Sequence, residues 1–337
     1  MKSTWRRQTR SEWTFFHWFY ELLGLHHQEL DEVVPVRLKT DAVPYMPGWS
    51  LHLWLITHTM IPLLIHHAYL QITGYNLSTL GALLLYSTAT QLINIHEVHI
   101  LRRYGHIHGF FDGYRHARDD VPDVGVAKAA SFLIFATIRP ILIVFLAYHT
   151  SQAPISISLS WLPLEIGLYG IILDFWYYWF HRLLHDVAPL WKYHRTHHLS
   201  THPNSLLTTY GDFEQELFEI VVIPLMTYFT MKFIGMPMGF YEWWLCGQYV
   251  FFAEIAGHSG VRVHAVVPST LSFVLRYFDS ELVTEDHDLH HRKGRKKNYN
   301  YGKQTRLWDR LFGTCGERIE SIESNVDYTN QSPMPLY

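Results

Sequence analysis

The sequence predicts an all-α fold, in which a polytopic bundle of membrane helices carries a cap on its cytosolic face. Three observations lead to this prediction. Charged residues make up only 17% of the 337 residues, below the roughly 25% typical of soluble domains, while aromatic residues make up 16%. Six apolar segments approach or reach the length of a membrane span. Histidine is abundant, at 24 residues, and much of it is clustered beside the ends of those segments.

The six apolar segments are arranged in pairs along the chain. They cover residues 51–73, 77–95, 131–150, 161–180, 217–236 and 240–257. A transmembrane helix needs about 20 mainly apolar residues, a length that these segments reach or approach. The last two segments contain glutamates, so they could instead be re-entrant or half-buried.

The distribution of Lys and Arg predicts which ends of these segments face the cytosol. Neither residue occurs within 51–95 or within 141–180. Basic residues occur instead between the pairs, at 37–39, 102–128 and 182–195, and in the run 292–297. By the positive-inside tendency these loops face the cytosol, which predicts hairpins that begin and end on one face.

Other features of the composition exclude several classes of protein. Cys246 and Cys315 lie in unrelated contexts, so neither a disulfide framework nor a zinc ribbon is expected. The first 20 residues are basic and aromatic without a long apolar core, which favours an interfacial helix over a cleaved signal peptide. A net charge of −3 gives no indication of nucleic-acid binding.

Three histidine clusters follow apolar segments on the predicted cytosolic face. They read "HRLLH" from His181, "HRTHH" from His194 and "HDLHH" from His287, and His258 stands alone after the sixth segment. Residues three or four apart share one face of a helix, so each cluster can direct several imidazoles toward one point. The candidate metal ligands are His181, His185, His194, His197, His198, His258, His287, His290 and His291.

These candidates are too many for one metal ion and suit two. Imidazole binds iron, copper, nickel and zinc, so the ligand type alone does not name the metal. A structural zinc site takes four ligands, usually including cysteine, whereas these clusters contain none. Two apolar segments separate the second cluster from the third, which returns the chain to the same face. The pattern therefore predicts a dinuclear centre with room for substrate or oxygen.

Other histidines and acidic residues are expected to have lesser roles. His58, His66 and His149 lie in apolar segments and are expected to be hydrogen-bonded interior residues, although paired histidines on spans can also ligate haem. Asp174 lies two turns before His181, where it could orient a ligand or merely pack between helices. Roles stay open for His202, beside the second cluster, and for His264, which is expected to be structural. The acidic residues Asp212, Glu214 and Glu216 are expected at the membrane edge without a chemical role.

The ordered boxes, followed by "NYGKQTRLWDRLFGT" at residues 300–314, resemble the fatty acid hydroxylase / sterol desaturase superfamily. The resemblance covers roughly residues 101–314. It implies an integral membrane enzyme, mainly of the endoplasmic reticulum, with a non-haem di-iron centre that uses O2 and two electrons. It further implies that the nine histidines are the iron ligands and that their site faces the cytosol.

The chain departs from the fatty acid 2-hydroxylase branch at two positions. His181 and His185 are one residue closer together than that branch has them, and Arg262 stands where the branch has a further histidine. These departures favour the sterol desaturase, methylsterol oxidase and sphinganine hydroxylase side. The haem motif His-Pro-Gly-Gly does not occur in the sequence. Electrons are therefore expected from a separate donor, such as cytochrome b5 and its reductase.

The resemblance implies an O2-dependent oxidoreductase that hydroxylates or desaturates a lipid-like substrate at an unactivated C–H bond. Sterol, sphingoid base, fatty acyl and specialised-metabolite lipids all remain open as substrates. The alternatives are a histidine-rich membrane metal transporter, with ligands at mid-span, and a haem electron carrier. The expected organisation is an interfacial segment (1–50), transmembrane hairpins with a cytosolic loop (51–160), a catalytic domain (161–314) and a flexible tail (315–337).

Overall fold

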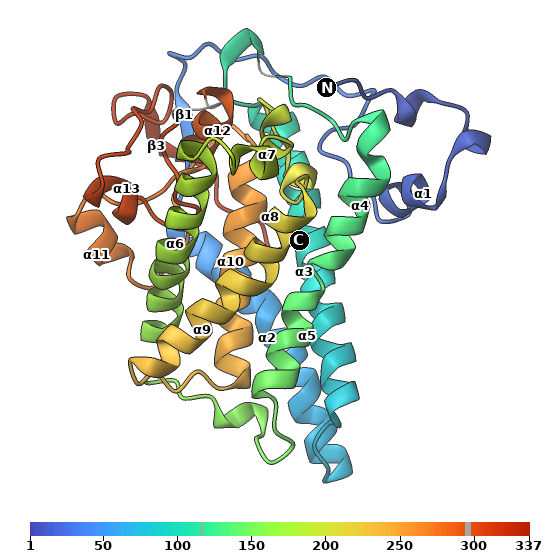
Figure 1. Ribbon diagram of the computed structural model, residues 1–337, viewed down its shortest axis with the longest axis vertical. Helices are drawn as coiled ribbons and strands as arrows, with labels where there is room; N and C mark the ends of the chain where they lie inside the picture. The colour runs from blue at the N-terminus through green and yellow to red at the C-terminus, as the bar shows by residue number, and fades with distance from the viewer. Residues whose placement is uncertain (116, 294–297) are drawn as a thin grey trace.

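Long helices run side by side and carry a cap of loops and short helices at one end, which is the upper end in Figure 1. The structure is a computed structural model that describes residues 1–115, 117–293 and 298–337. Most of the predicted basic run 292–297 therefore lies outside the described residues. The long helices are α2 (Gly48–Thr73), α3 (Thr79–His108), α6 (Leu162–Asp186) and α10 (Phe240–His258).

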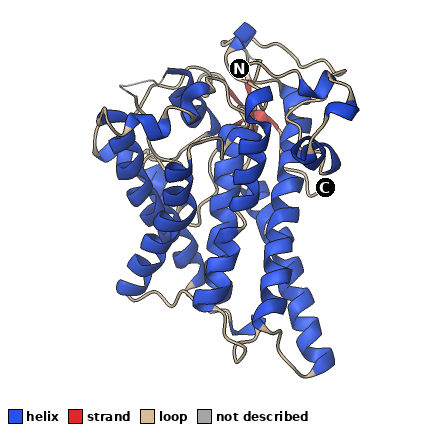
Figure 2. Cartoon of the chain, turned by 45° about the vertical axis from the view of Figure 1, so that its right-hand side comes forward, coloured by secondary structure: helices blue, strands red, loops and turns tan. Residues whose placement is uncertain are grey.

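Shorter helices complete the bundle and form much of the cap. In the bundle these are α4 (Val126–Phe135), α5 (Ile138–Ala147) and α9 (Ile223–Phe233). Around the cap are α1 (Phe15–Leu22), α7 (Trp191–His194), α8 (Phe213–Leu217), α11 (Ser272–Tyr277), α12 (Thr284–Lys293) and α13 (Leu307–Leu311). The predicted predominance of helix is therefore confirmed (Figure 2).

Local sequence explains where these helices begin and break. Gly74 ends α2 in the left-handed conformation, with φ of 72°, which glycine adopts without strain. Ser78 starts α3, because its side chain accepts a hydrogen bond from the Gly81 N–H. Pro140 lacks the N–H that would continue the helix back to Ala136, and a break separates α4 from α5 at that point.

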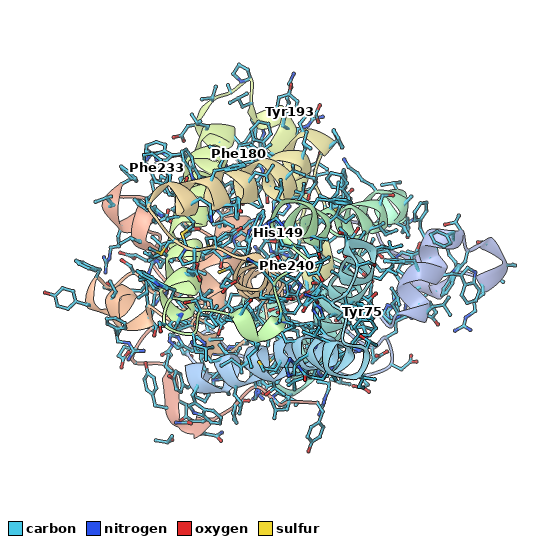
Figure 3. All side chains as sticks on the ribbon, turned by 90° about the horizontal axis from the view of Figure 1, so that it is seen from below. Tyr75, His149, Phe180, Tyr193, Phe233 and Phe240 are labelled. Atoms are coloured by element: carbon cyan, nitrogen blue, oxygen red, sulfur yellow. The ribbon has the colours of Figure 1, made fainter. Side chains whose placement is uncertain are left out.

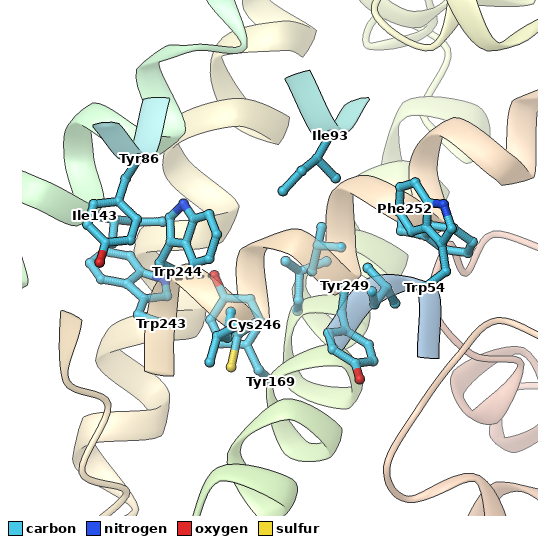
Figure 4. Close-up of a cluster of buried hydrophobic side chains, with 14 of the residues drawn as sticks. Trp54, Tyr86, Ile93, Ile143, Tyr169, Trp243, Trp244, Cys246, Tyr249 and Phe252 are labelled. Carbon is cyan, nitrogen blue, oxygen red and sulfur yellow. Dashed lines mark hydrogen bonds between the residues drawn. The ribbon is translucent and has the colours of Figure 1, made fainter. Parts of the chain in front are cut away.

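The hydrophobic core is centred on α10, which is buried along almost its whole length. Figure 4 shows aromatic residues from several helices packed around it. Trp243 donates a hydrogen bond from Nε1 to the Tyr169 hydroxyl at 3.0 Å, and Trp244 donates one to Thr90 Oγ1 at 3.1 Å. These bonds satisfy the polar ends of the large aromatic side chains, so that α10 can be surrounded by protein.

A small parallel sheet in the cap departs from the predicted all-α fold. Its strands are β1 (Val43–Met46), β2 (His264–Ala265) and β3 (Val326–Gln331), in the order β2-β1-β3. Tyr45 lies opposite His264 on one side and opposite Gln331 on the other. Two of the strands are shorter than the usual five or six residues and β1 contains a proline, so the sequence carries little strand signal.

The segment 315–337 has defined contacts in the structure, although the sequence led us to expect a flexible tail. Its strand β3 pairs with β1. Glu320 accepts a hydrogen bond from Arg262 Nε at 2.8 Å, and both side chains are buried. Arg262 thus ties the C-terminal segment to the cap.

Two helical segments among the described residues are long and apolar enough to cross a membrane. They are Gly48–Thr73 and Asp123–Ala147, the second of which contains the α4–α5 break. Large apolar side chains on the outside of the bundle are strongly exposed, such as Phe233 of α9 at 91%, at the rim of the view from below (Figure 3). The polytopic arrangement stays a prediction, and the number of membrane crossings stays open.

Candidate metal centre

All nine predicted histidines meet in the cap, and each is 3% or less exposed. They form two groups, and within each group the ligand nitrogens lie within 4.8 Å of one another. The first group is His181, His185, His194, His198 and His290, and the second is His197, His258, His287 and His291. The elements that bring them together are the end of α6, the turn around α7, the end of α10 and α12 (Figure 1).

The histidines of each three-histidine box divide in the same pattern between the two groups. His287 and His291 are four residues apart on α12 and enter the second group, while His290 enters the first. In the same way His194 and His198 share the first group, and His197 joins the second. Both three-histidine boxes therefore contribute to both groups.

Distances between the ring nitrogens fit ligands arranged around shared cations. His194 Nε2 lies 3.0 Å from Nε2 of both His181 and His198, and His287 Nε2 lies 3.0 Å from His258 Nε2. Two nitrogens that are each about 2.1 Å from one metal ion, at right angles, lie about 3.0 Å apart. The donor set and its spacing thus suit two metal ions, one in each group.

Hydrogen bonds on the far side of the rings fix how several imidazoles point. The Nδ1–H groups of His181, His258 and His290 donate to the carbonyl oxygens of Tyr301, Glu254 and Tyr299, each at 2.8 Å. This tautomer leaves the Nε2 lone pair facing the group. Lone pairs that face one another at 3 Å repel unless a cation lies between them. The arrangement is the one expected of metal ligands.

Burial also keeps the imidazoles of the cap neutral. It is the main cause that lowers the pKa of His194, His198 and His290 well below the ordinary value, and nearby imidazoles lower the pKa further. In the second group, burial and the neighbouring histidines have the same effect on the pKa of His197 and His287. Neutral imidazole is the form that binds a metal ion, so no proton has to leave at neutral pH.

Asp174 shapes the loop that carries the Tyr301 carbonyl. Its carboxylate accepts hydrogen bonds from the backbone N–H groups of Lys303, Gln304 and Thr305, at 2.7 to 3.1 Å, and from the Thr305 hydroxyl at 2.9 Å. Gly302 is needed in this loop because a Cβ there would lie 2.3 Å from the Thr305 carbonyl oxygen. Asp174 therefore orients His181 through the loop rather than by direct contact.

The bundle contains an apolar cavity of about 450 Å³, within the size range of small-molecule sites. It is lined mainly by α3, α4, the α4–α5 break, the turn after α8 and α10. Leu92 and Ile134 line it and are 61% and 42% exposed, so it opens between α3 and α4 on the apolar flank of the bundle. Phe19 and Leu23, in and beside α1, cover part of it.

Buried charged groups at the inner end connect the cavity with both histidine groups. Lys303 Nζ lies 2.6 Å from Glu219 Oε2, and Gln215 donates to Glu219 Oε1 at 2.9 Å. Gln215 in turn accepts a hydrogen bond from His194 Nδ1 at 2.9 Å. On the other side Glu254, whose carbonyl binds His258, forms an ion pair with Arg139 at 2.8 Å.

Sequence reasoning missed these residues because their partners lie far away along the chain. Arg139 and Glu254 are 115 residues apart, and Glu219 and Lys303 are 84 apart. Glutamates within an apolar segment were the available signal. A π-helical turn, Phe218–Val222, carries Glu219, and such turns are frequent at functional sites. Glu216, expected at the membrane edge without a role, is only 2% exposed and lines the cavity.

The remaining candidate histidines lie outside both groups. His202 interacts with Asp112 at 2.8 Å, and His264 belongs to strand β2. His66 has both ring nitrogens hydrogen-bonded, to Tyr86 and Asn76, as expected of an interior residue. His149 follows α5 at the lower end of the bundle and is exposed (Figure 3).

Comparisons with known proteins agree with the geometry. A family model described as fatty acid hydroxylase matches residues 166–314. Fatty acid hydroxylase vlmA of Lecanicillium sp is 40% identical over 307 residues, which is 87% of this chain and 84% of that protein. Alkylglycerol monooxygenase of Xenopus tropicalis is 30% identical over 52% of this chain and 34% of its own length. A Delta(7)-sterol-C5(6)-desaturase of Nicotiana tabacum is 27% identical over 48% of this chain and 54% of its own length.

The chain thus spans about a third to a half of the last two relatives, but most of the first. No solved structure gave a significant match. The resemblance read from the three histidine boxes is confirmed, and with it the expectation of an oxidoreductase of the hydroxylase type. The chain belongs to the fatty acid hydroxylase / sterol desaturase superfamily.

Proposed function

We propose that this chain is a membrane-bound, O2-dependent oxygenase that hydroxylates or desaturates a lipid-like substrate at an unactivated C–H bond. Two iron ions would be held by the nine buried histidines, five around one ion and four around the other. The observation that carries the proposal is that both groups are linked to residues lining one apolar cavity. His194 is linked through Gln215 to Glu219, and His258 is bonded to the Glu254 carbonyl. A metal transporter would need ligands along its spans, whereas these lie together at one end.

Iron and O2 supply the oxidising chemistry, and the residues of the chain orient, enclose and support it. Backbone carbonyls of Tyr299, Tyr301 and Glu254 hold imidazole rings so that their lone pairs face inward. The mainly apolar cavity suits a lipid-like substrate and would shield the reacting carbon from water. Its mouth between α3 and α4 faces the flank of exposed apolar side chains, which lets a lipid enter sideways.

The setting of the enzyme follows from the same features. We infer an integral membrane protein of the endoplasmic reticulum with the cap facing the cytosol, because the basic loops adjoin the cap. An external donor such as cytochrome b5 with its reductase would deliver electrons there. The haem-carrier alternative is not supported, because His66 is hydrogen-bonded through both nitrogens and His149 is exposed.

Metal analysis of the purified full-length protein tests this proposal. We expect about two irons per chain and no haem absorption band, because nine neutral imidazoles offer two separate ligand sets. Chelation should abolish oxygenation of lipid extracts, and ferrous iron should restore it. A folded protein that binds no iron, or one with a haem spectrum, would contradict the proposal.

Gln215 is expected to tune the first metal group without being a ligand. Its side chain accepts from His194 Nδ1 and donates to Glu219, so Gln215→Leu removes the group that orients His194. Loss of such a partner typically lowers metal affinity or activity about 10- to 100-fold. The measurement is iron content after dialysis against graded chelator, together with turnover. The exposed neighbour Glu214→Leu is the matched control on the same short helix, and an equal effect of both changes would argue against this role.

A further inference from the structure

Several buried polar atoms in the cavity are without a hydrogen-bond partner among the described residues. They are Ser87 Oγ, Asn94 Oδ1, Arg139 Nε, Thr209 Oγ1 and Glu216 Oε1. Two of the side chains come from α3, one from α5, and two from the chain at and before α8. Buried polar atoms normally have partners, so atoms that line a cavity without one indicate what its occupant offers.

The two residues on α3 belong to one polar stripe. Ser87, Gln91 and Asn94 occur at the spacing that places side chains on one face of a helix, and all three line the cavity. Ser87 and Asn94 are two turns apart, about 10 Å along the helix axis. Thr88, on the same helix, also lines the cavity. A plain hydrocarbon chain along it would leave these polar atoms unpaired, which costs free energy.

Charge at the inner end disfavours a free carboxylate as the occupant. Among the described residues that line the cavity the cations are Arg139 and Lys303, and each already pairs with a glutamate. Burial, with Glu219 nearby, raises the pKa of Glu216 well above its ordinary value. A neutral Glu216 both donates and accepts hydrogen bonds. A substrate carboxylate would add an uncompensated charge beside three carboxyl groups.

We propose that Glu216 is a specificity-determining residue that hydrogen-bonds a neutral oxygen group of the substrate, and that the substrate is a lipid with neutral oxygen groups at more than one depth. Ser87 and Asn94, two turns apart on α3, bind further oxygen groups of the same substrate. This inference rests on the proposed function and narrows its substrate class. It selects hydroxylated or keto lipids over free fatty acids and plain hydrocarbons.

Binding without turnover tests the selectivity. The full-length protein is placed in lipid nanodiscs without an electron donor, and ligand-dependent thermal stabilisation is measured as a titration. The probes are hexadecane, hexadecanoate and a hexadecanediol with one terminal and one mid-chain hydroxyl group. We expect the diol to bind about tenfold or more tightly than hexadecanoate, the difference that one well-placed buried hydrogen bond gives.

Variants of Glu216 separate its contact from a general effect on folding. Glu216→Leu should weaken diol binding about tenfold and leave hexadecane unchanged, whereas Glu216→Gln, which still donates and accepts, should retain most of the affinity. Glu214→Leu, exposed on the same helix, should match the wild type. Equal binding of the three probes, or a Glu216→Leu variant that still prefers the diol, would overturn the inference and indicate that water satisfies these atoms.

Iron content is measured on the same preparations, so that the two proposals fail separately. If the protein binds the diol selectively but holds no iron, the oxygenase proposal is wrong and the substrate inference stands. Two irons per chain without diol selectivity would overturn only the substrate inference. If Glu216→Leu fails to fold, the inference is tested by the Glu216→Gln variant and by the binding of the three probes to the wild type.

Discussion

Replacing His194 with alanine is expected to remove one metal ion and abolish oxygenation. Nε2 of His194 lies 3.0 Å from Nε2 of two other histidines, and its Nδ1 is held by Gln215, so it is central to the first group. His194→Ala should reduce bound iron from about two to about one per chain. Product formation should fall at least about 100-fold, because loss of a residue that only contacts a ligand already lowers activity by up to about that factor. Iron analysis and lipid product profiling of the purified variant measure both.

The control for this substitution lies in the same stretch of sequence. His202 is eight residues further on, but it interacts with Asp112 and belongs to neither group. His202→Ala should therefore keep both irons and most of the activity, with a small loss of thermal stability. If His194→Ala retained full iron and activity, or if both variants lost them equally, the assignment of the first group would be wrong.

The sequence could predict the site residues because the spacing of histidine is a local property. His181 and His185, one helical turn apart, converge as the pattern requires. Spacing did not predict how the boxes divide, because that depends on where the chain bends. After α7 the chain leaves the helix near Arg195, and His197 points to a different group from His194 and His198. The two metal positions are thus a tertiary feature built on local signals.

The fold was predictable to a similar depth. Apolar segments located the long helices, since α2 contains the segment 51–73 and α3 contains all but the first two residues of the segment 77–95. The sheet was not predictable, because β1 pairs with strands that lie more than 200 residues further along the chain. The cavity escaped prediction for the same reason. In the sequence, Arg139 and Glu254 are single charged residues within apolar helices. Only the structure shows that they form an ion pair at the inner end of the cavity.

Asp174 is expected to be the most sensitive position outside the histidines. Asp174→Ala leaves three buried backbone N–H groups without an acceptor, in the loop whose Tyr301 carbonyl holds His181. Each such loss costs about 1–3 kcal/mol, and removal of one partner of a buried charged network typically costs about 3–5 kcal/mol in total. The loop should loosen, and His181 should lose its orientation. We therefore expect lower thermal stability and weaker iron binding together.

Asp186 provides a matched comparison on the same helix. It is exposed and forms an ion pair with Arg182 at 3.1 Å, and exposed pairs of this kind contribute about 1 kcal/mol or less. Thermal unfolding and iron retention are measured for Asp174→Ala and Asp186→Ala in the same detergent. The positioning role is supported if only Asp174→Ala loses stability and also releases iron at lower chelator concentrations. A purely structural aspartate would lower stability without changing iron retention in the folded fraction. Equal behaviour of the two variants would show that the loop around Tyr301 is held by other contacts, among them the hydrogen bonds from the Tyr301 and Gly302 N–H groups to Asp309.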